Sequence, residues 1–238
     1  MKRMKFLCVL MSVLLLVLLV LCSCRKTSGD SDTAAVTTPG DEELSPTETV
    51  AFDTDVNVTV TEGVVSLTGE EVSITLSDDG ISCDSEAVTI SGSTVTITDE
   101  GTYVVTGSLS DGQIIVDAEK TDKVELILNG VGITSATSAP IYLKRADKLK
   151  LMLAEGSVNS LVNGGSYVAI DDNNIDAVIF AKDDLTLKGS GTLAIRATAG
   201  HGIVAKDDLK VTGGTYIIVT EKKGISVNDS AELNGGSL

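Results

Sequence analysis

A short pattern is repeated three times in the last 60 residues of the chain. The copies begin at Ile179, Ile203 and Ile225, and each contains an apolar strand, a turn with aspartate, a second apolar strand and a glycine-rich turn. Their starting points are 24 and then 22 residues apart. Units of this length are too short for helical repeats and match one coil of a parallel β-helix, a solenoid of stacked strands. The repeat therefore predicts a parallel β-helix with coils of about 22–24 residues.

Alternation of apolar and polar residues extends this β prediction over most of the chain. From Val56 onward, short segments rich in Val, Ile and Thr alternate with a period of two, which is typical of half-buried strands. Looser copies of the repeat occupy 112–133 and 139–158. The pattern predicts an all-β chain with N-terminal strands over 55–98 and the β-helix over 99–238.

Glycines recur just after the second strand of each clear copy, as at Gly213 and Gly214. A coil must turn sharply there, and a backbone with positive φ excludes most side chains. Between such turns, the apolar residues of successive coils are predicted to face inward and to stack, Leu209, Val211 and Ile217 among them. The sequence stops at Leu238 within a copy, so we expect the C-terminal coils to be truncated.

The first 23 residues have the composition of an export signal. Three basic residues precede a long apolar run, and Leu21-Cys22-Ser23-Cys24 resembles a bacterial lipobox. That resemblance predicts cleavage before Cys24 and acylation of Cys24, whereas an uncleaved anchor helix is the alternative. Residues 24–54, rich in Ser, Thr, Asp and Glu, are predicted to be a flexible tether. We therefore expect an extracytoplasmic protein anchored by lipid to the bacterial cell membrane or surface.

The chain is strongly acidic, with 34 Asp and Glu against 18 Lys and Arg and a formal net charge of −16. Removal of the signal would also remove Lys2, Arg3 and Lys5 and make the mature chain more acidic. Such a charge makes nucleic acid and anionic lipid headgroups poor partners. Cations, and polymers that cations can bridge, are more suitable.

The repeated turns bring aspartates into equivalent places. Asp183 and Asp184 in one copy correspond to Asp207 and Asp208 in the next. Carboxylates stacked about 5 Å apart repel one another, and solvent, the neighbouring lysines or a bound cation can relieve this repulsion. Oxygen-rich acidic clusters suit Ca²⁺. A calcium site and a solvated turn balanced by lysine both fit the sequence.

A second group of oxygen-bearing residues lies in an insertion at about 159–176 that interrupts the repeat. Loops that interrupt a regular scaffold often carry function. The candidate ligands here are Asp171, Asp172 and Asp176, with Tyr167 beside them. A calcium loop and a merely solvated loop remain alternatives, because the segment lacks an EF-hand pattern.

Catalysis has little support in the sequence. His201 is the only histidine, and it lies between two glycines without a recognisable nucleophile motif. A Ca²⁺-assisted lyase would instead need a basic residue to remove the proton next to a uronate carboxylate. Arg196, Lys182 and Lys206 are the candidate bases, although lysines beside acidic turns commonly only balance charge.

Two kinds of segment resemble a known family. GQIIVDA, within 98–135, and AKDDL, found twice later, are similar to bacterial carbohydrate-binding domain-containing proteins, and the likeness covers about 98–238. The resemblance implies a secreted, right-handed parallel β-helix like that of pectate lyases. It also implies binding of acidic polysaccharide, such as polygalacturonate, with calcium at the aspartates of the AKDDL turns.

These observations lead to one main hypothesis and two alternatives. The main hypothesis is a non-catalytic, lipid-anchored module that binds acidic polysaccharide, with Ca²⁺ as a bridge. The residues expected to contact the polysaccharide are Lys182, Lys206, Arg196 and Tyr167. The alternatives are a Ca²⁺-dependent pectate lyase and a structural surface adhesin.

Overall fold

The computed structural model describes residues 58–238, which all belong to one compact unit, Ala51–Leu238. The predicted signal of residues 1–23, the acylated Cys24 and the tether of residues 24–54 lie outside the described residues. In the part that is described, no helix is long and apolar enough to cross a membrane. Strands and turns make up this part of the chain, so the all-β prediction is confirmed.

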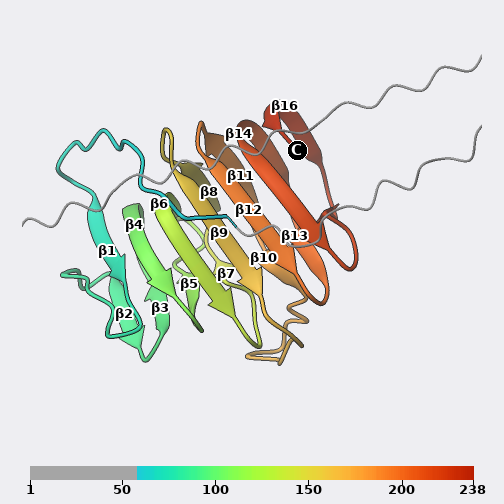
Figure 1. Cartoon of the computed structure of the whole chain (residues 1–238), viewed down its shortest axis with the longest axis horizontal. Coiled ribbons are helices and arrows are strands. Elements are labelled where there is room, and N and C mark those ends of the chain that lie inside the picture. Colours follow the sequence, from blue (N-terminus) through green and yellow to red (C-terminus); the bar gives the residue numbers. More distant parts are fainter. Residues whose placement is uncertain (1–57) are drawn as a thin grey trace, which may run out of the picture. The chain divides into compact units, whose positions relative to one another are not determined.

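The strands of the described chain form two sheets (Figure 1). The strands are β1 Val72–Leu76, β2 Val88–Ser91, β3 Thr94–Ile97, β4 Gly101–Leu109, β5 Gln113–Asp117, β6 Lys123–Ser135, β7 Ile141–Arg145, β8 Lys148–Leu153, β9 Val158–Asn163, β10 Ala177–Ala181, β11 Asp184–Gly189, β12 Thr192–Ala197, β13 His201–Ala205, β14 Leu209–Thr220, β15 Ile225–Val227 and β16 Ala231–Ser237. One sheet has nine strands in the order β1-β4-β6-β8-β11-β14-β12-β9, with β16 beside β14. The other has seven, in the order β15-β13-β10-β7-β5-β3-β2.

The nine-stranded sheet closes on itself through two long strands. The first half of β6 pairs with β8, and its second half pairs with β9. In the same way, the first half of β14 pairs with β11 and its second half with β12. Because β9 also pairs with β12, the strands β6, β8, β11, β14, β12 and β9 make a closed ring of six parallel strands.

This ring corrects the fold predicted from the repeat. The right-handed parallel β-helix, a solenoid with separate strands on each face of a coil, is wrong: the structure is a closed six-stranded parallel barrel with an additional sheet. The reason lies at the glycines. The sequence places a corner at Gly213 and Gly214, but β14 runs through both of them, and Gly214 takes a φ of 90° within the strand. Gly130, with a φ of 73°, lies in the same way inside β6.

The copies of the repeat nevertheless lie beside one another in parallel register. Ile179 of β10 pairs with Ile203 of β13, which pairs with Ile225 of β15. Leu185 of β11 likewise pairs with Leu209 of β14. Equivalent residues of successive copies are therefore neighbours, and this register determines which polar side chains meet on the surface.

The main core is almost entirely aliphatic and receives side chains from both sheets. Leu209 and Val211 are at most 1% exposed, as predicted, and so are Leu185 and Leu187 of the preceding copy. Ile217 is 39% exposed, however, and its neighbour on β14, Tyr216, is the buried residue. The alternation thus changes phase between the two halves of β14, where the glycines lie.

Candidate functional site

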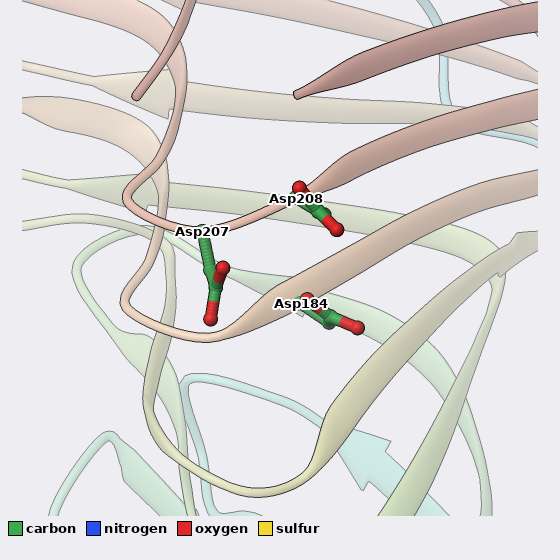
Figure 2. Close-up of side chains that lie close together, drawn as sticks. All are labelled: Asp184, Asp207 and Asp208. Carbon is green, nitrogen blue, oxygen red and sulfur yellow. The ribbon is translucent and has the colours of Figure 1, made fainter. Parts of the chain in front are cut away.

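Three aspartates from two successive copies converge at the ends of neighbouring strands (Figure 2). Asp184 begins β11, Asp208 immediately precedes β14, and Asp207 lies in the turn before it. Each offers a carboxylate oxygen, and these oxygens all lie within 4.8 Å of one another. Within residues 58–238 this is the one group of three or more acidic, histidine or cysteine side chains with such spacing. We call it the aspartate cluster.

The parallel register of β11 and β14 explains the aspartate cluster. Leu185 pairs with Leu209, so the preceding residues, Asp184 and Asp208, are also side by side. The leucines point into the core, and a strand alternates its side chains between two faces. The two aspartates must therefore point outward from adjacent strands, about one strand spacing apart.

Repulsion between the carboxylates is only partly relieved by their neighbours. Partial desolvation, followed by the charges of Asp184, Asp229 and Asp208, raises the pKa of Asp207 above its usual value. The Lys148 ammonium lies 3.0 Å from the Asp184 carboxylate. Ser230 donates two hydrogen bonds to Asp208, from its backbone N–H at 3.1 Å and its hydroxyl at 2.6 Å. Among residues 58–238 Asp207 forms no ion pair, and its side-chain contact is with another carboxylate, that of Asp229, so the cluster retains unbalanced negative charge.

An open groove lies beside the aspartate cluster on the outward face of the sheet. Its polar lining comes from β8, β11, β14, β16 and the turns before them: Lys148, Asp184, Thr186, Asp208, Lys210, Ser230 and Glu232. The Lys210 ammonium donates to the Glu232 carboxylate at 2.7 Å, and this bond lowers the pKa of Glu232. The lining contains both signs of charge and no aromatic ring.

Asp183, the first aspartate of its turn, does not join the cluster. It is 8% exposed, forms an ion pair with Lys120, and accepts a hydrogen bond from the backbone N–H of Ala146 at 3.1 Å. Asp183 thus ties two turns together, whereas Asp184 reaches the surface.

The aspartates of the insertion do not form such a cluster within the described part of the chain. Asp171 accepts hydrogen bonds from the Tyr142 hydroxyl at 2.7 Å and from the backbone and side chain of Asn173, both at 2.8 Å. Partial desolvation raises the pKa of Asp171, but these donors outweigh it and lower the pKa overall. Asp172 is exposed, and the Asp176 carboxylate lies 3.8 Å from Nε2 of His201. Asp171 therefore fixes the loop to buried Tyr142.

The residues expected to contact carbohydrate are spread over three places. Lys182 and Lys206 lie in the same turns as the aspartates, and the Lys206 ammonium is 5.5 Å from the centre of the Phe180 ring. Arg196 is on β12, between β9 and the second half of β14. Tyr167 lines a different pocket in the insertion, and burial, followed by the charge of Asp176, raises its pKa.

Sequence reasoning missed several residues of the groove. Lys148 and Lys210 precede or alternate with buried strand residues, whereas Ser230 and Glu232 lie in and before the exposed strand β16. The segment Lys148–Leu153, KLKLML, contained the signal, because its lysines occupy the positions that face away from the leucines. What the sequence did not show is which of many alternating polar residues lie next to Asp184.

Comparison with known proteins identifies the family. Residues 91–238 match the family described as "Carbohydrate-binding domain-containing protein". A protein of that description from Acetivibrio thermocellus is 44% identical over 126 residues, which are 52% of this chain. The match spans 44% of that relative's length, so the chain corresponds to less than half of it.

A solved structure is also similar to this chain. It is described as the polysaccharide lyase-like protein from C. thermocellum, in a gadolinium derivative. It is similar to this chain with a TM-score of 0.60 and 33% identity, over 68% of this chain and 74% of the other. The family that the sequence resembles is therefore confirmed, and the chain belongs to the carbohydrate-binding domain-containing protein family.

Proposed function

We propose that this protein is a non-catalytic module that binds acidic polysaccharide along the groove beside the aspartate cluster, with Ca²⁺ as a bridge. The observation that carries the proposal is the convergence of Asp184, Asp207 and Asp208 at an open, charged groove, which Asp184 and Asp208 help to line. Family membership supports carbohydrate as the ligand. The chemistry of the groove supports an acidic one.

The spacing of the aspartate cluster suits a calcium ion. Ca²⁺ binds oxygen ligands at about 2.3–2.6 Å, so two ligands on opposite sides of an ion are up to about 5 Å apart. The carboxylate oxygens of Asp184, Asp207 and Asp208 fall within that limit at 4.8 Å. Desolvation, followed by repulsion from Asp184, Asp229 and Asp208, raises the pKa of Asp207, and a bound cation would relieve that repulsion. A bound Ca²⁺ would supply positive charge that a uronate carboxylate can share.

The other groove residues suit an acidic chain of sugars better than a neutral one. Neutral sugars usually need aromatic rings to pack against, and the groove has none. Lys148 and Lys210 bring ammonium groups to an open surface, where a ligand carboxylate would share them with Asp184 and Glu232, and Thr186 adds a hydroxyl. Ammonium groups form their stronger hydrogen bonds with charged acceptors such as carboxylates.

Export and lipid anchoring complete the proposal and rest on the sequence of residues 1–24. A module attached through Cys24 and a tether over 24–54 would present its groove outside the bacterial membrane. Polysaccharide would then be captured at the cell surface.

Isothermal titration with polygalacturonate, in Ca²⁺ and then in EDTA, tests the proposal. We expect affinity to fall in EDTA, and Asp208→Asn to weaken binding in Ca²⁺ on the order of tenfold, because calcium affinity depends on ligand charge. Asp79→Asn is the matched control, since Asp79 is exposed in the loop after β1, far along the sheet order from β11. Equal affinity with and without EDTA would exclude the calcium bridge.

The same samples test the absence of catalysis. A lyase produces an unsaturated uronate, which absorbs ultraviolet light, whereas a binding module leaves the polymer intact. A steady rise in absorbance that requires Ca²⁺ would show that the protein is a lyase and would refute the non-catalytic proposal.

A further inference from the structure

A second open groove has the opposite charge from the rest of the protein. It is lined by Lys120, Lys144, Arg145 and Lys182, with Asp117 as its one acidic residue. Four basic residues in five are unexpected in a chain whose acidic residues outnumber basic ones by 34 to 18. The groove lies where β5, β7 and β10 end, at the turns that lead to β6, β8 and β11.

Ion pairs within this groove leave one ammonium uncompensated. Asp117 forms ion pairs with Lys144 at 2.7 Å and with Nε of Arg145 at 3.2 Å, and Arg145 also pairs with Glu119 at 3.5 Å. Lys120 pairs with Asp183. Among residues 58–238, Lys182 has no acidic partner within ion-pair distance. The groove therefore carries net positive charge that is centred on Lys182.

The sheet register extends this charge into a row of three lysines. Leu143 pairs with Ala181, so Lys144 and Lys182 follow them as neighbours, and the N–H of Lys182 donates to the Leu143 carbonyl at 3.0 Å. Ala181 in turn pairs with Ala205, and the N–H of Lys206 donates to the Ala181 carbonyl at 2.8 Å. Lys144, Lys182 and Lys206, which we call the lysine row, thus follow one another at the strand spacing of about 4.8 Å.

We propose that the lysine row binds the carboxylates of an acidic polysaccharide directly, without a metal ion. This deepens the proposed function and rests on it, because it assigns the same class of ligand to a separate surface. The strand spacing is comparable to the length of one pyranose residue in an extended chain, so successive uronates can meet successive lysines. Phe180 supports the end of the row, since the Lys206 ammonium lies over its buried ring.

Binding of a carboxylate requires a cation at the aspartate cluster but not at the lysine row. Carboxylate ligands repel the aspartates unless a cation lies between them, whereas they attract ammonium groups at any calcium concentration. Salt screens exposed charges over about 8–10 Å. Binding to the lysine row should therefore persist in EDTA and weaken as salt is added.

Titration with polygalacturonate in EDTA, for Lys182→Glu and for Lys182→Gln, tests the inference. We expect wild-type protein to keep a salt-sensitive affinity in EDTA, which Lys182→Glu weakens on the order of tenfold and Lys182→Gln weakens less. Lys223→Glu makes the same charge change at an exposed residue in the β14–β15 turn and should leave the affinity unchanged. Circular dichroism of each variant monitors folding.

The outcomes separate this inference from the proposed function. Wild-type binding that occurs only in Ca²⁺, or equal binding by Lys182→Glu and Lys223→Glu, would refute the lysine row and leave the proposed function intact. No binding of polygalacturonate under either condition would refute both. Residual binding by Asp208→Asn that Lys182→Glu removes would support both.

Discussion

Replacement of Asn159 by alanine should destabilise the protein strongly, because its buried side chain connects three segments. Asn159 lies on β9 and is 0% exposed. Its Oδ1 accepts a hydrogen bond from the N–H of Val131 on β6 at 2.9 Å. Its Nδ2 donates to the Ser157 hydroxyl at 2.9 Å and to the Thr192 carbonyl on β12 at 3.1 Å. One amide therefore joins three neighbouring strands of the six-stranded ring.

The expected loss follows from these contacts. Alanine at position 159 would leave the N–H of buried Val131 without this acceptor, at a cost of about 1–3 kcal/mol. Loss of the bond to the Thr192 carbonyl adds roughly 0.5–1.5 kcal/mol. We expect a total of about 3 kcal/mol in the free energy of unfolding. For a domain of this size that corresponds to a decrease in Tm of roughly 6–12 °C.

Asn163→Ala is the matched control, because Asn163 lies on the same strand, β9, and its side chain points to the same face as that of Asn159. Asn163 is also 0% exposed, but its Nδ2 makes only longer bonds, at 3.4 Å to the Ser135 carbonyl and 3.3 Å to the Ser138 carbonyl. Urea unfolding followed by circular dichroism would measure both variants, and we expect Asn163→Ala to lose only about 1 kcal/mol. If Asn163→Ala were as destabilising as Asn159→Ala, the assignment of the energy to the Val131 acceptor would be wrong.

Two further predictions concern single carboxylates. Asp183→Asn should lower the free energy of unfolding by about 1–3 kcal/mol, because the buried Asp183 carboxylate pairs with the exposed Lys120 ammonium and accepts the N–H of Ala146, and it should leave calcium affinity unchanged. Asp184→Asn should weaken calcium binding and leave the free energy of unfolding unchanged; thermal melts and calcium titration would measure both. The pKa of Glu71 is lowered to about 2, first by the backbone N–H of Thr68 and then by its hydroxyl. Since this pKa is lowered on folding, its stabilising effect is present above the unfolded value and is lost as pH falls toward 2; carboxyl NMR should show the pKa rising in Thr68→Val.

Much of the secondary structure could be predicted from the sequence, but the closure of the sheet could not. Alternation of branched aliphatic and polar residues identifies strands because side chains on a strand point to opposite faces. The glycines at 213 and 214 are compatible with two structures, since a glycine with positive φ can end a strand or bend one. In β14 they bend it, which is why Ile217 is exposed while Tyr216 is buried.

The aspartate cluster was predictable in outline, because repeated turns in parallel strands bring equivalent residues together. The different positions of the two aspartates within one turn could not be predicted. Asp183 and Asp184 are adjacent in sequence and equal in chemistry, yet one is buried against Lys120 and the other reaches the groove. Their difference depends on Lys120 and Ala146, which approach from other turns and leave no local signal in the sequence.

The contacts of the aspartates in the insertion could not be predicted from the sequence either. Asp171, Asp172 and Asp176 resemble a set of calcium ligands because they are close in sequence. In the structure Asp171 is occupied by Tyr142 and Asn173, and Asp176 lies near His201. Close spacing along a loop thus says little about which oxygens converge, since each can be taken by a donor from a distant strand.

The third copy of the repeat defines where both charged surfaces end along the sheet. At the place of Lys206 it has Asn228, whose N–H donates to the Ala205 carbonyl at 3.0 Å in continuation of the register. At the place of Asp208 it has Ser230, which donates hydrogen bonds to Asp208 instead of adding a charge. Asn228 and Ser230 are uncharged, so the third copy adds neither a lysine to the lysine row nor a carboxylate beside Asp208, and repulsion between like charges is smaller there. Asn228→Lys should therefore extend the lysine row by one strand and strengthen binding of polygalacturonate in EDTA, whereas unchanged affinity would mean that the row does not follow the polysaccharide chain.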